Sequence, residues 1–285
     1  MALNGSSFSF RYLFAVTRPR FWLYLAGPYL LGYAAASETP DRMLRTEFWL
    51  YLLFFLFPAN LLLYGANDLG DSDTDALNPK KGTKEARMDG RAKPLAWAVA
   101  LSLLIGVVAA VSLATWAARS TMALFLFLSL GYSLTPLRFK ARPFLDMASN
   151  VLYALPGFVG YLQAGGQGFN PLVLSFAWCW TASMHLFSAI PDVESDRRAG
   201  VATAATVLGE RRSLGLCSFL WAAAAASLIV GRLLWPWCLA TLAYPAVTLL
   251  LLRNSGAGVE RAYWVFPALN GLFGMAAFFL IALKL

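Results

Sequence analysis

Long apolar runs separated by short polar stretches dominate the chain. Nine of them are long enough to cross the ~30 Å hydrocarbon core of a bilayer as helices. They cover residues 19–36, 48–66, 95–117, 121–137, 145–165, 171–191, 213–231, 233–252 and 262–283. The composition agrees, because 59% of the residues are hydrophobic and 13% are charged, against about 25% charged in soluble domains. We predict an all-α polytopic membrane protein with nine transmembrane helices.

The charged residues are segregated between the loops. With nine spans, the N-terminal tail and the loops after spans two, four, six and eight share one side, which carries 18 of the 23 Lys and Arg residues. The positive-inside rule places that side, and the N-terminus, in the cytoplasm. Twelve of the fifteen acids lie there too, which the rule does not explain because it concerns Lys and Arg. An active site on the cytoplasmic face would explain them.

The start of the chain lacks the pattern of a cleavable signal.

The first acidic cluster follows the second apolar run. If that helix continues past residue 66, Asn67, Asp71 and Asp75 recur every four residues, and Asp68 falls on the same stripe. Asp73 lies off the stripe and is assigned to solvent or to an indirect role. Carboxylates this close repel one another, and a position beside a membrane makes their ionisation costlier. A cation between them would offset both effects.

The second acidic cluster follows the sixth apolar run. Asp192 and Asp196 are four residues apart, whereas Glu194 points elsewhere on a helix. Two facing helix ends that carry carboxylates can hold Mg²⁺ through oxygen ligands, with positions left for water and phosphate oxygens. The alternative is that these acids are solvated loop charges or helix caps. Two such clusters at helix ends on one face favour the metal site.

Basic residues accompany both clusters. Lys80 and Lys81 follow the first cluster, Arg197 follows the second, and Arg138 and Lys140 lie in the loop between them. Each of these residues taken alone is a plausible topology determinant. Together with a metal they form the usual grip on a diphosphate group. Their clustering with acids argues against a nucleic-acid partner, although the formal net charge is +8.

The motifs resemble those of one enzyme family. The pattern Asn67-Asp68-x-x-Asp71-x-x-x-Asp75, the pair Asp192-x-x-x-Asp196, and the segment from Tyr132-Ser133 through Arg138 and Lys140 are similar to the UbiA superfamily of intramembrane prenyltransferases. The similarity covers residues 1–285 as a single domain. It implies nine helices around a central cavity that opens to lipid and is capped by cytoplasmic loops. It also implies a bacterial or archaeal-type cell membrane, and no protein partner is expected.

A narrower resemblance is to the lycopene elongase branch, which makes C50 carotenoids. It rests on the stretch from Asp73 to Lys81 and on the stretch from Asp192 to Gly209. It implies transfer of a dimethylallyl group from its diphosphate to a lipophilic acceptor, lycopene or a related carotenoid. In this mechanism the metal neutralises the diphosphate, an allylic cation forms inside the bundle, and the acceptor attacks it. The alternative acceptor is an aromatic ring, as in quinone, tocopherol or chlorophyll-type pathways.

A transporter or channel is the alternative from another class, since rings of acids can line a cation path. The confinement of the acids to one face and the lack of an ionised group near the centre of a span argue against it.

Three further residues are candidates to line the substrate cavity. His185 lies seven residues before Asp192 and could be a catalytic base, an acceptor contact or an interhelical hydrogen-bond partner. Asn150 could line the cavity mouth, and Tyr132 could face a carbocation.

Overall fold

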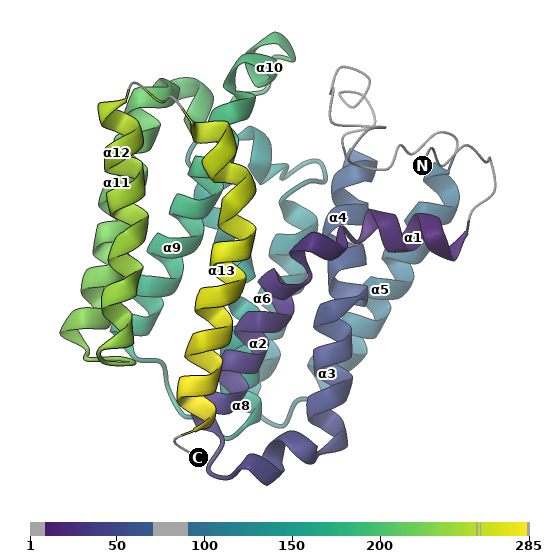
Figure 1. Ribbon diagram of the computed structural model, residues 1–285. Helices are drawn as coiled ribbons and strands as arrows, with labels where there is room; N and C mark the ends of the chain where they lie inside the picture. Colours follow the sequence, from purple (N-terminus) through teal and green to yellow (C-terminus); the bar gives the residue numbers. More distant parts are fainter. Residues whose placement is uncertain (1–8, 71–90, 255, 257, 284–285) are drawn as a thin grey trace. The chain divides into compact units, whose positions relative to one another are not determined.

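Within the described residues, every regular element is a helix (Figure 1). The structure is a computed structural model and describes residues 9–70, 91–254, 256 and 258–283. The described chain divides into two compact units. The first contains α1–α6 and α8, and the second contains α7 and α9–α13.

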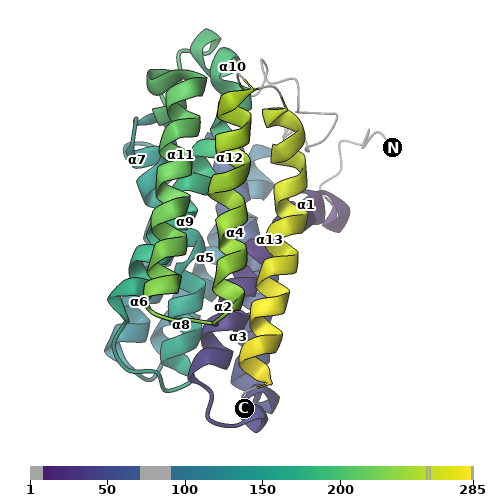
Figure 2. The ribbon, with the colours of Figure 1, turned by 60° about the vertical axis from the view of Figure 1, so that its left-hand side comes forward.

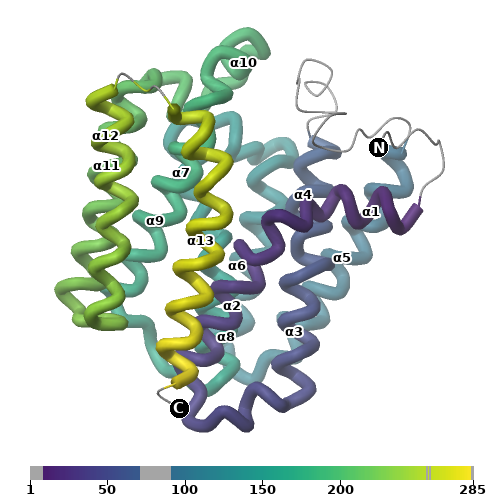
Figure 3. The backbone as a smooth tube through the Cα atoms, viewed as in Figure 1, coloured from purple at the N-terminus to yellow at the C-terminus, as the bar shows by residue number. Residues whose placement is uncertain are grey.

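The first unit is built from helices that pack in pairs. Their bounds are α1 Phe10–Val16, α2 Leu23–Ala36, α3 Thr46–Leu56, α4 Pro58–Gly70, α5 Ala92–Ser112, α6 Trp116–Gly131 and α8 Leu155–Gln163, with short 3-10 turns η1 at Pro19–Phe21 and η2 at Pro40–Leu44. The largest contacts join α2 to α8 and α4 to α5, and α6 packs against α8 and α5. The tube in Figure 3 runs from α3 directly into α4, because Pro58 takes the first position of α4, where its missing N–H is harmless.

Glycines allow α2 and α8 to approach closely. A Cβ atom on Gly32 would lie 1.8 Å from the carbonyl oxygen of Gly157, and one on Gly160 would lie 2.5 Å from that of Tyr29. Small residues at helix contacts of this kind are typical of membrane proteins, where packing drives helix association. The fully buried Tyr29 donates a hydrogen bond of 2.9 Å from its hydroxyl to Gln163 Oε1. Together these contacts fix α2 on α8.

The second unit surrounds an aromatic core. Its elements are η4 Phe139–Ala141, α7 Leu145–Ala148, η5 Ser149–Tyr153, α9 Pro171–Ala189, η6 Ile190–Asp192, α10 Val193–Arg198, α11 Ala204–Val230, η7 Trp237–Leu242, α12 Ala243–Arg253 and α13 Val259–Ala282. In the view of Figure 2, α11 and α12 lie side by side. Phe187 of α9, Trp221 of α11, Tyr244 of α12 and Phe266 of α13 meet with ring centroids 4.7–5.7 Å apart. Aromatic pairs at such separations stabilise beyond their buried area.

All nine predicted segments fall on helices, but not all are single helices. Within the described residues, five helices are long and apolar enough to cross a membrane: Thr46–Gly70, Ala92–Ser112, Pro171–Arg198, Ala204–Val230 and Val259–Ala282. The prediction of nine single spanning helices is therefore borne out only as an all-α fold with several apolar helices.

Segment 48–66 divides into α3 and α4 at Pro58, and two further predicted segments are broken near a proline. Segment 145–165 consists of α7, η5 and α8, and segment 233–252 consists of η7 and α12. Pro156 enters in the first turn of α8 and Pro236 immediately precedes η7. Because proline cannot donate a backbone hydrogen bond in a helix interior, each segment restarts near its proline instead of continuing.

The α2–α8 contact generates a stability prediction. Gly32→Ala places a methyl group against backbone atoms of Gly157 that cannot turn aside. We expect a loss of about 1–3 kcal/mol, the usual range for overpacking, or more. Thermal unfolding of the purified protein in detergent measures it. Gly27→Ala is the matched control, because the new Cβ on the same helix meets nothing within 4 Å. Equal melting temperatures for the two variants would contradict the close approach.

Candidate active site

The first acidic motif begins at the C-terminal end of α4. Asn67 and Asp68 are helical, and the helix continues at least to Gly70. The condition of the stripe argument, a helix that continues past residue 66, therefore holds as far as Gly70. Asp68 is buried, with 3% of its surface exposed, and Asn67 is half-buried. The other predicted residues of this motif and its loop, Asp71, Asp73, Asp75, Lys80 and Lys81, lie outside the described residues.

Asp68 forms an ion pair with a residue from the N-terminal segment. Nη2 of Arg18 lies 3.1 Å from Oδ1 of Asp68, and the two side chains are 16% and 5% exposed. The guanidinium also lies 4.8 Å from the centroid of the Tyr64 ring, one helical turn before Asp68. Arg18 has a φ of +50°, a backbone conformation that is unfavourable for a residue with a side chain. Such local strain is typical of functional positions.

Asn67 contacts the segment that follows α6. The Ser133 hydroxyl donates a hydrogen bond of 3.1 Å to Oδ1 of Asn67. The backbones are also close there, because a Cβ on Gly70 would lie 2.5 Å from the carbonyl oxygen of Ser133. The Tyr132–Ser133 motif therefore packs against the end of α4. Tyr132 is the half-buried C-cap of α6, and Arg138 is half-buried with a φ of +39°.

The second acidic motif lies where α9 ends. Asp192 is the last residue of η6 and Asp196 lies in α10, so their four-residue spacing crosses a junction between a 3-10 turn and an α-helix. Both are half-buried. Glu194 is exposed and pairs with Arg198 at 3.0 Å, which agrees with its expected separate orientation.

Two basic residues of the predicted diphosphate grip lie in the second unit. Arg197 is exposed, and its Nη2 donates a hydrogen bond of 2.9 Å to the carbonyl oxygen of Thr206. Lys140 lies half-buried in η4. The bond from Arg197 fixes the end of α10 to the start of α11.

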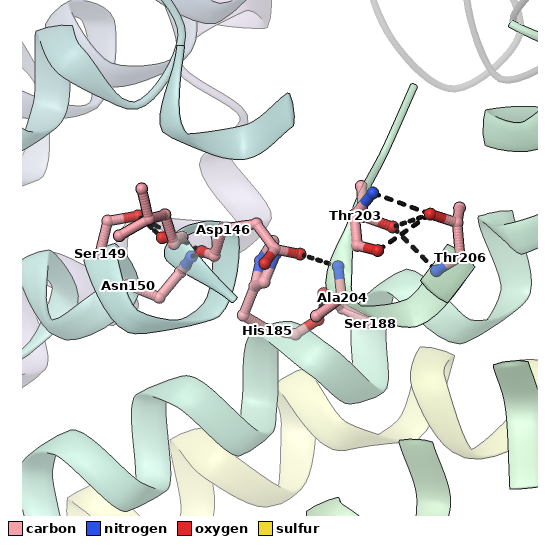
Figure 4. A network of polar contacts seen from close by, with 9 residues as sticks. Asp146, Ser149, Asn150, His185, Ser188, Thr203, Ala204 and Thr206 are labelled. Carbon is pink, nitrogen blue, oxygen red and sulfur yellow. Dashed lines mark hydrogen bonds and ion pairs between the residues drawn. The ribbon is translucent and has the colours of Figure 1, made fainter. Parts of the chain in front are cut away.

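Two of the three cavity candidates meet at one residue that the sequence did not single out. Asn150 is buried and donates a hydrogen bond of 2.5 Å from its amide to the carbonyl oxygen of Asp146. Nε2 of His185 lies 3.5 Å from Oδ2 of the same Asp146 (Figure 4). Of the alternatives for His185, an interhelical polar contact is therefore present, because His185 is on α9 and Asp146 is on α7.

The structure brings only part of the predicted site together. Asn67 meets Ser133, and both Asn150 and His185 meet Asp146. Within the ranges that the structure describes, no group of three or more His, Cys, Asp or Glu side chains is placed to hold a metal ion. Asp71 and Asp75, two of the six predicted ligands, are outside those ranges.

Arg18 and Asp146 were missed by sequence reasoning. Arg18 has the appearance of an ordinary basic residue near a membrane surface, and only its backbone conformation and its contact with Asp68 distinguish it. For Asp146 a signal existed, since a single acid at the edge of an apolar run requires a partner when it is buried.

Comparison with known proteins identifies the family. The UbiA prenyltransferase family model matches residues 25–270. The lycopene elongase/hydratase of Haloferax volcanii is 43% identical over 270 residues, which cover 93% of this chain and 86% of the relative. The lycopene elongase/hydratase of Halobacterium salinarum is 43% identical over 93% of this chain and 95% of the relative.

A solved structure has the same fold. A UbiA homolog from Archaeoglobus fulgidus bound to GPP and Mg²⁺ superposes with a TM-score of 0.74 over 93% of this chain and 99% of its own, at 21% identity. The same homolog bound to DMAPP and Mg²⁺ gives a TM-score of 0.68 over 94% and 99% of the two chains, at 19% identity. Because the family model matches most of its length, and because it has helices long and apolar enough to cross a membrane, this chain belongs to the UbiA prenyltransferase family and is an integral membrane prenyltransferase.

Proposed function

We propose that the enzyme transfers a dimethylallyl group from its diphosphate to a terminal double bond of lycopene or a related carotenoid. The observation that supports this most strongly is the 43% identity, over 93% of the chain, to a lycopene elongase/hydratase. Both relatives described above have that activity, which favours a polyene acceptor over an aromatic ring. The A. fulgidus homolog of the same fold binds DMAPP and Mg²⁺, which supports a five-carbon donor.

The proposed metal ligands are the oxygens of both acidic motifs, from Asn67, Asp68, Asp71, Asp75, Asp192 and Asp196. This set fits Mg²⁺, because carboxylate and amide oxygens are the ligands that this ion accepts in proteins. The ion pair between Asp68 and Arg18 is a second indication that this carboxylate lies where a cation binds. Asp68 is buried, and the guanidinium of Arg18 lies 3.1 Å from its carboxylate. Mg²⁺, when bound, would act as a Lewis acid on the diphosphate oxygens.

The proposed diphosphate-binding residues are Lys80, Lys81, Arg138, Lys140 and Arg197. Lys and Arg side chains stabilise the charge that collects on the leaving pyrophosphate when the allylic C–O bond breaks. The Arg197 guanidinium donates a hydrogen bond to the Thr206 carbonyl oxygen at the start of α11. All these residues, and the N-terminus, are assigned to the cytoplasmic side by the distribution of Lys and Arg.

The remaining task of the protein is to keep water from the allylic cation. Apolar side chains of the membrane helices exclude water from the cation. The prenyl tail of the donor and the acceptor are both lipophilic, so they enter from the bilayer. Tyr132, at the end of α6 and beside the segment that contacts Asn67, is the aromatic side chain proposed to face the cation. His185 and Asn150 are proposed to lie at the acceptor. The whole chain is proposed to act as one prenyltransferase domain.

Expression in a bacterial host that accumulates lycopene tests the acceptor. We expect pigments that are heavier than lycopene by one or two five-carbon units, with or without added water, in extracts analysed by mass spectrometry. The same host with an empty vector is the control. Unchanged lycopene in cells that contain the folded enzyme would contradict the carotenoid acceptor.

Removal of the acids tests the proposed ligands. Asp68→Ala and Asp192→Ala should each lower pyrophosphate release in purified enzyme by about 10²-fold or more, because each removes a charge-bearing group at the reacting diphosphate. Both lie at helix ends, so membrane insertion should be unchanged. Glu194→Gln is the matched control, since Glu194 is exposed and pairs only on the surface with Arg198, and it should keep wild-type activity within about twofold. Full activity in either alanine variant would remove that residue from the site.

Removal of the metal provides a further check. Treatment of the purified enzyme with a chelator should abolish pyrophosphate release, and added Mg²⁺ should restore it, because hard oxygen ligands bind this ion reversibly. Assays of pyrophosphate release with dimethylallyl diphosphate and lycopene measure the effect. Activity that persists after complete chelation would exclude the metal from the reaction.

A further inference from the structure

A fully buried carboxylate lies outside the proposed metal and diphosphate groups. Asp146 on α7 is 0% exposed. Its Oδ2 accepts a hydrogen bond of 2.9 Å from the backbone N–H of Ala204, the first residue of α11, and lies 3.5 Å from Nε2 of His185 (Figure 4). Its Oδ1 is buried and has no hydrogen-bond partner among the described residues. A buried carboxylate is expensive unless it is compensated, so this arrangement requires an explanation.

Capping of α11 does not by itself explain Asp146. The helix already has a capping box, in which Thr203 Oγ1 accepts a hydrogen bond from the N–H of Thr206 at 3.2 Å, and Thr206 Oγ1 accepts one from the N–H of Thr203 at 2.8 Å. This pair satisfies the N–H groups of Thr203 and Thr206, and Asp146 adds only the N–H of Ala204. The approach of the His185 ring, with Nε2 at 3.5 Å from Oδ2, is the contact of Asp146 that the cap leaves unaccounted for.

The position of Asp146 is fixed by its own segment. The Asn150 amide donates to the Asp146 carbonyl oxygen at 2.5 Å, and the Ser149 hydroxyl donates to the carbonyl oxygens of Leu145 and Asp146 at 2.7 and 3.3 Å. These bonds hold α7 and η5 together, so the carboxylate is presented from a rigid turn. Preorganisation of this kind is what a group that orients another residue needs.

His185 is suited to exchange a proton near the second acidic motif. It is the single histidine of the chain, and its side chain is 14% exposed, whereas Asp146 is closed to solvent. It lies on α9 seven residues before Asp192, which places it on the order of 10 Å along the helix axis from that acid. Imidazole is the side chain that most readily gains and loses a proton near neutral pH.

We propose that His185 accepts the proton released when prenyl transfer ends, and that Asp146 is the positioning residue that holds the imidazole and balances its charge. This inference rests on the proposed function and deepens it. It gives a role to a carboxylate–imidazole contact whose two residues are not among the proposed metal and diphosphate ligands. The carboxylate and the imidazole correspond to the base-and-orienting-acid arrangement found in many hydrolases.

The chemistry requires such an acceptor whichever way the reaction ends. The allylic C–O bond breaks, and pyrophosphate leaves with its electron pair. The π electrons of an acceptor double bond form the new C–C bond and leave a tertiary cation on the acceptor. Either a neighbouring C–H bond supplies the electrons of a new double bond and loses its proton, or a water oxygen adds and then loses a proton. Both routes release one proton, which the lone pair of His185 takes up beside the negative charge of Asp146.

The experiment measures two products in the same reaction. Purified full-length enzyme in lipid receives Mg²⁺, dimethylallyl diphosphate and lycopene, and both pyrophosphate and prenylated acceptor are quantified. Without the base, the acceptor cation reverts and the allylic cation is captured by water. In His185→Ala, we therefore expect the ratio of prenylated acceptor to pyrophosphate to fall by about tenfold or more. Loss of a general base is large enough to cause this fall, because such a base typically contributes about 10²–10⁴-fold to the rate. Pyrophosphate release itself should stay within about threefold of wild type.

Three further variants separate proton transfer from structure. His185→Gln keeps an N–H donor toward Asp146 but has no basic nitrogen, so it should lower the ratio as His185→Ala does, even if the alanine variant folds poorly. Asp146→Asn keeps an oxygen for the Ala204 N–H but loses the charge, and should lower the ratio less. Ser188→Ala removes only a hydroxyl that donates to the His185 carbonyl oxygen on α9, and should leave the ratio unchanged.

A last variant tests whether Asp146 acts only as a cap. Thr203→Ala weakens the same helix start without touching His185, so its ratio should match wild type. The inference is overturned if Thr203→Ala reproduces the effect of Asp146→Asn. It is also overturned if both His185 variants keep the wild-type ratio, or if both products fall in the same proportion. A wild-type enzyme that releases no pyrophosphate would instead contradict the proposed function itself.

Discussion

Negative charge held at the ends of membrane helices is the constraint on which this structure depends. Moving a carboxylate out of water costs several kcal/mol even after the protein relaxes, unless a partner offsets it. Asp68 is offset by Arg18 at 3.1 Å, and Asp146 by the Ala204 N–H and by His185. In each case the partner comes from a distant part of the chain, so the acids and the fold stabilise one another.

These charge pairs depend on ordinary packing elsewhere. In the first unit, the glycines at positions 32, 157 and 160 let α2 and α8 touch backbone to backbone. In the second, the rings of Phe187, Trp221 and Phe266 connect three helices. The hydrophobic effect between helices is weak in lipid, so the close packing of these glycines and rings stabilises the helix contacts instead. The polar residues can then be placed at helix ends without loosening the helices that carry them.

The sequence predicted what depends on local pattern. Apolar runs predicted the helices, and the condition on which the stripe of Asn67 and Asp68 rested, a helix that continues past residue 66, holds in α4. It could not predict the break of segment 145–165 into α7, η5 and α8, which depends on side-chain bonds of Ser149 and Asn150 to the backbone as well as on Pro156. Hydropathy treats all these residues as members of one run.

The residues that were missed share a physical reason. Arg18 adopts a positive φ, and its side chain reaches Asp68, fifty positions away. Asp146 reaches α11, fifty-eight positions away. Contacts over such separations depend on the tertiary fold, and a single sequence contains no periodic signal for them. Motifs in one short stretch, such as Asp192 and Asp196, are recognisable without the fold.

We propose that the acids of both motifs bind a cation together with a diphosphate. Calorimetric titration of the enzyme with an unreactive thiolodiphosphate analogue of the donor, with and without Mg²⁺, tests it most directly. The account predicts binding only with Mg²⁺, and an affinity more than about 100-fold weaker when either Asp68 or Asp192 is replaced by alanine, because loss of an indirect partner alone costs 10–100-fold. Equal affinity in the presence and absence of Mg²⁺, or in the wild type and either variant, would contradict it.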